Sequence, residues 1–243
     1  MDFTKIDDLQ SKLKAMRPLN PAELSRLRND FIIENTYNSN AIEGNTLTLR
    51  ETALILQEGI TIAEKPVKEH LEVIGHKDAF EYILTLADSQ TLLTEKVIQV
   101  IHSLVLISDA SSRGIYRRLP VTIMGAMHTP PQPDLIPVQM EQLLADYTSS
   151  QGKHIIETLA EFHLRFEGIH PFIDGNGRTG RLILNLELIK AGLLPINIKF
   201  ADRRKYYECF DCYYGASKSA KTLIELIIHY EIEEIEKYLN ILI

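Results

Sequence analysis

The stretch HPFIDGNGRTGR, residues 170–181, places a histidine, an aspartate, an asparagine, two arginines and three glycines within twelve positions. Glycines at this density destabilise regular structure, each by about 1 kcal/mol in a helix interior. Pro171 disfavours helical geometry at His170, so the helical pattern before it is expected to end there. After the glycines, apolar residues recur at helical spacing over 182–193. The stretch therefore predicts a loop that joins two helices.

The loop also carries the groups of an anion site. Gly175, Asn176 and Gly177 can bring successive backbone N–H groups to one point, as an anion-binding nest does. The next helix is expected to begin near Arg178, so its positive end faces the same point. Arg178 and Arg181 are three residues apart and are expected on one face of that helix. Together these groups predict a polyphosphate site.

Two further side chains of the loop could act on a bound polyphosphate. Asp174 would supply the protein carboxylate that Mg²⁺ uses beside phosphate oxygens and water. His170 could take a proton from an attacking hydroxyl. The alternative, a Gly-rich turn with solvated arginines, explains the glycines but not the presence of a base, a metal ligand and two cations in one turn. The spacing fits neither a Walker A loop nor a dinucleotide fingerprint.

The rest of the chain is predicted to be almost entirely helical, which indicates an all-α fold. Apolar residues recur three and four apart, and start and stop signals divide them into segments. One helix is expected from the N-cap Asn20, with Pro21 and Glu23 in its first turn, towards Gly44. The other expected helices are 6–16, 48–59, from Pro66, from Thr94, 138–147, 154–168, 178–191, 203–214 and from 221.

One segment, residues 114–137, has a different character. VTIM (121–124) favours a β-strand, and GAMHTPPQPDLIP (125–137) is rich in turn formers. We expect a strand and a protruding hairpin-like loop here. At the end of the chain, IIHYEIEEIEKYLNILI (227–243) is apolar on more than one face. Packing onto the domain is the simpler interpretation, and a contact between two copies of the chain, giving a homodimer, is the alternative.

Composition narrows the function classes. The 243 residues carry a net charge of −7, with 45% hydrophobic and 24% charged residues, so a nucleic-acid partner or an anionic-membrane surface is not expected. The N-terminus has no signal-peptide pattern, and no apolar run reaches membrane-spanning length. The expected location is cytoplasmic. Cys209 and Cys212 lack a second ligand pair, so packing accounts for them better than zinc.

Residues 170–181 resemble the signature HPFx[DE]GNGRxxR of the Fic family of adenylyltransferases at every position. The resemblance extends to GIYR (114–117), to the loop 125–137, to EFHLRFEGIHPF (161–172) and to KYYECF (205–210), and covers roughly residues 66–215. It implies a single Fic-type helical domain over 66–243 with a small β-hairpin flap, preceded by an N-terminal helical extension over 1–65.

The resemblance implies an enzyme, a nucleotidyltransferase that moves AMP from ATP to a Ser, Thr or Tyr hydroxyl of a target protein. By this analogy His170 is the general base and Asp174 holds Mg²⁺, and the flap, 122–133, binds the target through strand-like pairing. The residues implied to hold ATP are Gly175, Asn176, Gly177, Arg178, Arg181, Tyr206 and Tyr207, with the two arginines on the β and γ phosphates. Tyr214 departs from relatives that have a base-contacting Asn at this position, which leaves the choice of nucleotide open.

A second motif, SNAIEGN (39–45), resembles the Fic inhibitory motif [ST]xxxE[GN] at Ser39, Glu43 and Gly44. Without the resemblance, Glu43 is a negative charge at the negative end of a predicted helix. Such a charge is disfavoured by about 0.3–1 kcal/mol unless a cation pairs with it. An exposed, tolerated glutamate is the simpler alternative. The resemblance implies that Glu43 pairs with Arg181 and keeps ATP in a non-productive pose, so that inhibition is intramolecular.

Two other functions remain open at this stage. The protein could act mainly as a de-AMPylating hydrolase, with Glu43 positioning the water that removes AMP. It could also be a nucleotide-sensing module that binds ATP without turnover. The intact His170, Asp174 and Arg181 disfavour the second alternative.

Overall fold

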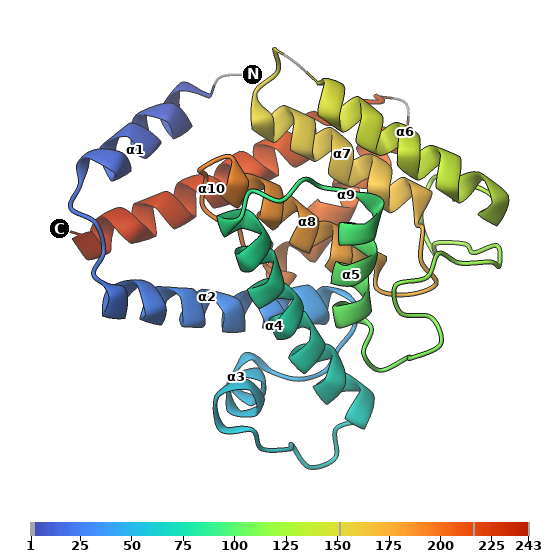
Figure 1. The fold of residues 1–243 in the computed structure, drawn as a ribbon, viewed down its shortest axis with the longest axis horizontal. Helices are drawn as coiled ribbons and strands as arrows, with labels where there is room; N and C mark the ends of the chain where they lie inside the picture. Colours follow the sequence, from blue (N-terminus) through green and yellow to red (C-terminus); the bar gives the residue numbers. More distant parts are fainter. Residues whose placement is uncertain (1–2, 151, 216, 243) are drawn as a thin grey trace.

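The computed structural model describes residues 3–150, 152–215 and 217–242, and within these ranges no residue is assigned to a strand. The all-α prediction is confirmed. The helices are α1 (Thr4–Ala15), α2 (Pro21–Ile42), α3 (Leu49–Glu58), α4 (Val67–Asp88), α5 (Glu95–Val105), η1 (Pro133–Leu135), α6 (Ile136–Ser149), α7 (Ile155–Ile169), α8 (Asn176–Lys190), η2 (Phe200–Asp202), α9 (Arg203–Tyr214) and α10 (Lys221–Leu242) (Figure 1).

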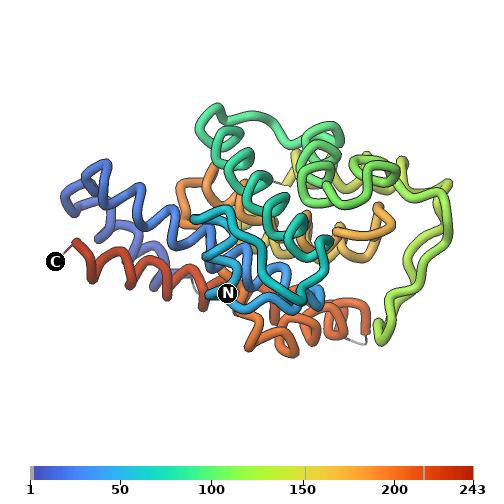
Figure 2. The backbone as a smooth tube through the Cα atoms, turned by 90° about the horizontal axis from the view of Figure 1, so that it is seen from below, coloured from blue at the N-terminus to red at the C-terminus, as the bar shows by residue number. Residues whose placement is uncertain are grey.

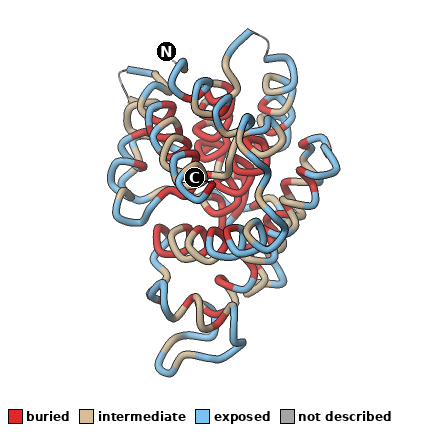
Figure 3. The backbone as a smooth tube through the Cα atoms, turned by 90° about the vertical axis from the view of Figure 1, so that its left-hand side faces the viewer, coloured by how far each residue is buried: buried red, intermediate tan, exposed pale blue. Residues whose placement is uncertain are grey.

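The helix that follows the opening loop, α8, is the centre of the molecule. It packs against α4, α5, α7 and α2, and Figure 3 shows the buried residues concentrated in the middle of the fold. Leu182, Ile183 and Leu186 of α8 are fully buried, and burial of each such side chain stabilises the fold by about 1.5–3 kcal/mol. The N-terminus of α8, where the loop ends, is therefore fixed by the core on several sides.

The predicted boundaries of α2 are confirmed by its capping contacts. The Asn20 side chain accepts hydrogen bonds from the N–H groups of Ala22 and Glu23, at 3.0 and 2.9 Å, and Glu23 bonds back to the Asn20 N–H. At the other end, Glu43 is the C-cap and Gly44 has φ +96°, a left-handed conformation that ends the helix. The end of α2 is thus specified locally, and Glu43 is the last group before the turn.

The segment before residue 66 shares its core with the later helices. Phe31 of α2 packs on Phe80 of α4, with ring centroids 5.6 Å apart, inside the same cluster as the buried side chains of α5, α7 and α8. A second cluster joins α1, α7, α9 and α10 around Tyr206 and Ile227. The C-terminal helix α10 packs on α1, α7 and α9. None of the helices in the described part is both long and apolar enough to cross a membrane.

The predicted strand at 121–124 is not formed, which corrects that expectation. Residues 117–132 run out from the body as an extended, hairpin-like loop without strand pairing, which we call the flap loop (Figure 2). Four prolines at 120, 130, 131 and 133 lack the N–H that a ladder needs. The backbone hydrogen bond within the loop runs from Ala126 N–H to the Ile123 carbonyl, at 3.1 Å. The β-favouring residues are therefore extended but have no partner strand.

Candidate active site

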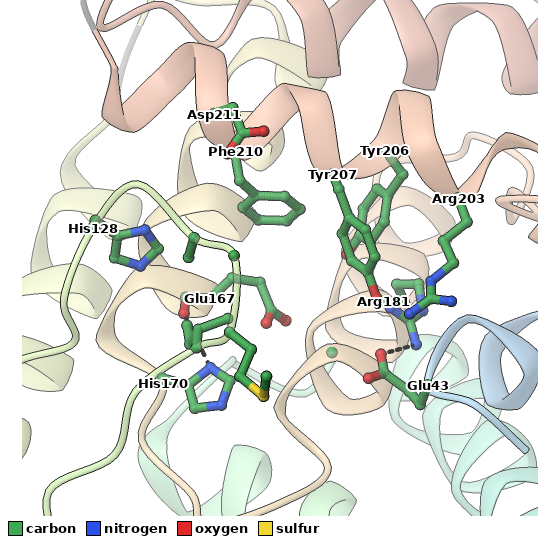
Figure 4. A pocket seen from close by; sticks show the side chains of 15 residues that line it. Glu43, His128, Glu167, His170, Arg181, Arg203, Tyr206, Tyr207, Phe210 and Asp211 are labelled. Atoms are coloured by element: carbon green, nitrogen blue, oxygen red, sulfur yellow. Dashed lines mark hydrogen bonds and ion pairs between the residues drawn. The ribbon is translucent and has the colours of Figure 1, made fainter.

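A cavity of about 360 Å³ opens where the end of α2, the end of α7, the start of α8, the helix α9 and the flap loop meet (Figure 4). Figure 4 shows Glu43 and Arg181 on one side of this cavity and His170 and His128 on the other, with Glu167 between them. The sequence-predicted residues that line the cavity are Glu43, His170, Gly177, Arg181, Tyr206 and Tyr207.

The loop before α8 is held in shape by one amide side chain. Asn176 donates to the Phe172 carbonyl and accepts from the Phe172 N–H, both at 2.9 Å, and is itself 2% exposed. Gly175 has φ +79°, which favours glycine, and caps α8. The side chain of Asn176 therefore closes the loop and does not line the cavity, whereas Gly177 does. The first N–H groups of α8 have no intrahelical acceptor, as at any helix start.

His170 is presented to the cavity by an unusual backbone. It is the C-cap of α7 with φ +50°, a conformation uncommon for a residue with a side chain. Arg117 stabilises this turn: its Nε donates to the His170 carbonyl at 2.8 Å, and its backbone N–H donates to the Pro171 carbonyl. The same guanidinium donates to the carbonyls of Leu119 and Pro131, so it also ties the flap loop to the turn.

The His170 ring is poised to accept a proton. Its Nδ1 lies 3.3 Å from the Glu167 carbonyl, which can only accept, so Nδ1 carries the hydrogen and Nε2 has a free lone pair. Burial is the main cause that lowers the pKa of His170, to about 4, and Arg117 adds to it. The imidazole is therefore neutral near pH 7 and can act as a base there.

Asp174 lies at the edge of the loop. Its Oδ1 accepts from the Gly175 N–H at 2.6 Å and from Arg178 at 3.2 Å, and Lys68 lies 3.5 Å from Oδ2. Burial would raise the pKa of Asp174, but Arg178 and Lys68 hold it below its usual range. The side chain is 47% exposed. A charged, accessible carboxylate beside a helix N-terminus fits Mg²⁺ shared with phosphate oxygens and water.

His102 of α5 fixes the backbone at Asp174. The Gly114 N–H donates to His102 Nδ1 at 2.8 Å, so Nε2 carries the hydrogen and donates to the Asp174 carbonyl at 2.8 Å. The ring stacks on Phe172 with centroids 3.6 Å apart. Nothing in the sequence pattern distinguished His102 from a histidine with only a packing role. Its partner is 72 residues away.

Arg181 is joined to the end of α2. Its Nη2 donates to Glu43 Oε1 at 2.8 Å and to the Ser39 carbonyl at 2.8 Å, and its Nε donates to Ser39 Oγ at 3.0 Å. Burial alone would lower the pKa of Arg181, but Glu43 raises it above the ordinary value. The remaining donor, Nη1, is buried without a hydrogen-bond partner among the described residues.

The Glu43 carboxylate lies against the start of α8. A Cβ added to Gly177 would be 2.2 Å from Glu43 Oε1, so this close approach requires a glycine. An anion is favoured at a helix N-terminus, and Glu43 occupies that position together with Arg181. The carboxylate therefore sits on the anion-binding groups that the sequence assigned to a phosphate.

The structure does not bring Arg178 into the cavity beside Arg181. Arg178 is 1% exposed and reaches Glu72 at 3.3 Å and Asp174 at 3.2 Å, with Asn40 at 3.4 Å. Glu72 belongs to α4 and also accepts from Asn45 at 3.0 Å. Arg178 thus joins α8 to α2 and α4 on the far side of the loop.

The aromatic side of the cavity comes from α9. Tyr206 is 1% exposed, and its hydroxyl lies 2.7 Å from Nε2 of the buried His163. The Arg181 guanidinium lies 5.6 Å from the Tyr206 ring centre. Tyr207 donates to the Ile42 carbonyl at 3.2 Å, and Arg203 lies 5.2 Å from its ring centre. A flat ring system could lie against these aromatic side chains.

Tyr214, the departure noted in the sequence, points away from the cavity lining. Its hydroxyl donates to the Leu164 carbonyl at 2.9 Å, and its ring stacks on His128 of the flap loop with centroids 3.8 Å apart. Gly168 makes room for it, since a Cβ there would be 1.7 Å from the Tyr214 hydroxyl. Tyr214 therefore supports the flap loop through His128.

Five titratable or aromatic residues of the cavity were not singled out individually from the sequence: His128, Glu167, Arg203, Phe210 and Asp211. The sequence could have indicated Glu167, because it is the one carboxylate among the mainly apolar buried residues of α7, the helix before the signature. The other four lie on α9 and the flap loop, where local spacing does not show which face meets the cavity.

Comparison with known proteins places these features in a family. The model of the Fic/DOC family matches residues 92–188. The protein adenylyltransferase Fic of Nematostella vectensis is 34% identical over 209 residues, which are 84% of this chain and 48% of that protein. The protein of the same name from Aedes aegypti is 35% identical over 210 residues, or 85% and 42%. The chain thus spans about half the length of the curated relatives it matches.

Solved structures agree over almost the whole chain. A Fic domain containing signaling protein from Bacteroides thetaiotaomicron has a TM-score of 0.89 at 29% identity, over 98% of this chain and 97% of that chain. Fic-1 of C. elegans, residues 134–508, has a TM-score of 0.85 at 27% identity, over 97% of this chain and 70% of that one. The similarity includes the helices before residue 66 as well as the part matched by the family model.

Proposed function

Since this chain carries a Fic domain and so belongs to the Fic/DOC family, we propose that it is a protein adenylyltransferase that moves AMP from ATP to a Ser, Thr or Tyr hydroxyl of a target protein. The observation that carries the proposal is His170, a neutral imidazole whose free nitrogen faces a cavity beside the start of α8. As part of the proposal, residues 66–243 form the catalytic domain and 1–65 an extension that regulates it.

In the proposed reaction, the target hydroxyl oxygen bonds to the α-phosphorus of ATP while the bond to the bridging oxygen breaks. Pyrophosphate leaves with that electron pair, and His170 Nε2 takes the hydroxyl proton. Gly177 and the first N–H groups of α8 hold the phosphates, and Arg181 binds the γ-phosphate. Tyr206 and Tyr207 lie along the base. Asp174 would hold Mg²⁺, which supplies positive charge to the phosphates when bound.

The proposed target binds along the flap loop. Residues 122–132 form a loop that has no strand partner within the described ranges, and apart from a turn at Ile123–Ala126 and the bonded carbonyls of Pro131 and Gln132 their backbone groups can pair with an added chain. Arg117 ties the flap loop to the turn at His170. This contact would keep a target segment bound along the loop close to the His170 imidazole, the general base.

Glu43 is proposed to inhibit the reaction. Its carboxylate occupies Arg181 and the space over Gly177, where the γ-phosphate would otherwise lie. An ATP molecule that binds while this contact persists lacks its phosphate anchor and is held in a non-productive pose. We call the arrangement in which Glu43 pairs with Arg181 the closed arrangement. Ser39 supports it because the Ser39 hydroxyl and carbonyl oxygens both accept hydrogen bonds from Arg181.

The same carboxylate favours a second candidate activity, removal of AMP from a modified target. Glu43 is 33% exposed in its side chain and lines the cavity, so it could orient a water towards the phosphorus. The two activities are separated by incubating an AMP-modified target with the wild type and with Glu43→Gly. Loss of AMP that needs Glu43 supports the hydrolase, and equal loss with both proteins excludes this role.

The test of the proposed function uses ATP labelled at the α-phosphate, with Mg²⁺ and a cell lysate. We expect strong protein labelling by Glu43→Gly, weaker labelling by the wild type and none by His170→Ala. With ATP labelled at the γ-phosphate, the kinases of the lysate should label proteins equally for all variants and the additional signal of Glu43→Gly should be absent, because that phosphate departs with pyrophosphate. Glu58→Gly is the matched control: Glu58 also ends a helix before a positive-φ glycine, but it does not line the cavity. Equal labelling by all variants from ATP labelled at the α-phosphate contradicts the assignment.

A further inference from the structure

Glu167 is a buried carboxyl in the cavity that the proposed reaction does not use. It lies in the last turn of α7, three residues before His170, and is 8% exposed. Figure 4 shows its carboxyl in the middle of the cavity, between His170 and Arg181. A glutamate placed among polyphosphate-binding groups requires an explanation, because its charge would repel the ligand.

The contacts of Glu167 disfavour the charged form. Its Oε1 is buried with no hydrogen-bond partner among the described residues, and a Cβ added to Gly180 would be 2.3 Å from it. Burial of a carboxylate without a partner is costly, and the group responds by staying protonated. Burial raises the pKa of Glu167 to about 8, Arg181 opposes this, and Glu43 adds to it. At neutral pH the carboxyl is thus neutral and has one O–H to donate.

The charged and titratable groups around Glu167 come from every element that forms the cavity. They are Arg181 on α8, Glu43 at the end of α2, His170 in the loop, His128 on the flap loop, Arg203, Tyr206, Tyr207 and Asp211 on α9, and His163 on α7 itself. Burial holds the pKa of His170 and His163 low, at about 4 and 3, and that of Tyr206 well above its ordinary value. These three groups do not change charge between pH 7 and pH 9.

A phosphate chain would bring negative charge to Glu167. Arg181 is already balanced by Glu43 in the closed arrangement. When phosphates replace Glu43 at Gly177, an ionised Glu167 would oppose them, whereas a protonated one can donate to them. The Oε1 atom is closed off behind Gly180, so the carboxyl meets a ligand through its other oxygen.

We propose that Glu167 binds the nucleotide in its protonated form and donates its carboxyl hydrogen to an oxygen of the phosphate chain. The inference rests on the proposed function in that it takes the phosphates to lie on Gly177 and Arg181. Binding then keeps the proton on Glu167, and affinity for ATP falls as the pH rises above the pKa of the free carboxyl.

The test measures the dissociation constant of ATP with Mg²⁺ from about pH 7 to about pH 9.5, in the wild type and in Glu43→Gly protein, each carrying Glu167, Glu167→Gln or Glu167→Ala. Because Glu43 raises the pKa of Glu167, the fall in affinity should begin at a lower pH in the Glu43→Gly protein. In protein that carries Glu167, we expect the affinity for ATP to fall by up to about tenfold per pH unit above the pKa of the Glu167 carboxyl. Glutamine keeps the shape and a donor, so affinity stays high and independent of pH. Alanine weakens binding about tenfold at pH 7, because one hydrogen bond to a charged group is lost. The phosphates of ATP titrate near 6, below this range.

Two controls isolate the site. Glu231→Gln removes another buried carboxyl, whose pKa is raised to about 7 by burial far from the cavity on α10, and should leave the pH profile unchanged. Adenosine, which lacks phosphates, should bind with no pH dependence above pH 7. A pH profile shared by Glu167 and Glu167→Gln, or one that persists with adenosine, overturns the inference.

These outcomes are independent of the transfer reaction. If ATP binds with the expected pH dependence but no AMP reaches any protein, the inference on Glu167 stands and the proposed function fails. If AMP is transferred while Glu167→Gln follows the pH profile of the parent, the proposed function stands and the role of Glu167 is wrong.

Discussion

Arg178 and Arg181 lie three residues apart at the start of α8, and both are buried, yet they stand in different surroundings. Arg178 reaches Glu72 on α4, Asp174 in the loop and Asn40 on α2, and it does not line the cavity. Arg181 reaches Ser39 and Glu43 at the end of α2 and does line it. Two arginines of one signature therefore serve different parts of the molecule.

The difference lies in what can replace each partner. Arg178 is 1% exposed, its partner Glu72 is 11% exposed in its side chain, and its more exposed partner Asp174 does not line the cavity. Glu43 is 33% exposed in its side chain and sits in the cavity, so an incoming anion can take its place. A buried guanidinium thus has a structural role when none of its partners lies in the cavity and a ligand-binding role when one of them does.

The largest expected effect comes from Arg178→Met. It removes the buried cation of Glu72 and leaves this carboxylate with the more exposed Lys68, at 3.7 Å, and Asn45, and breaking a buried pair costs up to about 3–5 kcal/mol of the free energy of unfolding. Urea unfolding measures the loss, and Arg178→Met combined with Glu72→Leu should recover much of it. Arg204→Met, which breaks an ion pair whose arginine side chain is 92% exposed, is the control and should have little effect. A stable Arg178→Met protein with weakened ATP binding would show instead that Arg178 is a ligand.

Arg181→Met should give a smaller effect of a different kind. In the Glu43→Gly background we expect ATP affinity to fall about 10–100-fold, because a charge-assisted contact to phosphate contributes about 1.5–3 kcal/mol. In protein that keeps Glu43, the free energy of unfolding should change less with Arg181→Met than with Arg178→Met, since the Glu43 carboxylate left behind can be hydrated. Titration of ATP by calorimetry measures the first quantity and urea unfolding the second. A stability loss as large as that of Arg178→Met would remove the distinction between the two arginines.

His76 of α4 provides the test with the smallest expected effect at neutral pH, and its pKa responds to both arginines. Burial lowers its pKa to about 3, and Arg181 and Arg178 add to the effect. The folded pKa is below the unfolded value of about 6.5. The contribution of the neutral His76 to the free energy of unfolding is therefore fully present above pH 6.5. It is lost, by up to about 1.4 kcal/mol per pH unit, as the pH falls towards 3. His76→Gln should give a shallower dependence of unfolding free energy on pH, and identical slopes would show that His76 is not held neutral.

Much of the fold follows from local sequence. The capping residues Asn20 and Thr48 begin their helices as predicted, and Gly44 and Gly59 take the left-handed conformations that end them. Such signals depend on a few neighbouring residues. The all-α class follows as well, from apolar spacing repeated along the chain.

The partners of the loop side chains could not be predicted in this way. Arg178 was placed at the phosphates because spacing shows a shared helix face, but Glu72, which engages it, lies on α4. The Asn176 side chain closes its own loop, a contact that competes with any ligand and leaves no pattern in the sequence. Likewise, VTIM is extended without becoming a strand, because strand formation depends on a partner that the flap loop lacks.

The contact between Arg181 and Glu43 spans 138 residues and came from family resemblance, since no local signal connects them. The central claim is that Glu43 and the γ-phosphate compete for this one guanidinium. The most direct measurement is the dissociation constant of ATP for four proteins: the wild type, Glu43→Gly, Arg181→Met and the double variant. Such competition predicts that Glu43→Gly tightens ATP binding about tenfold or more when Arg181 is present and clearly less in Arg181→Met protein, where only the space over Gly177 is freed. An equal gain in both backgrounds would contradict it.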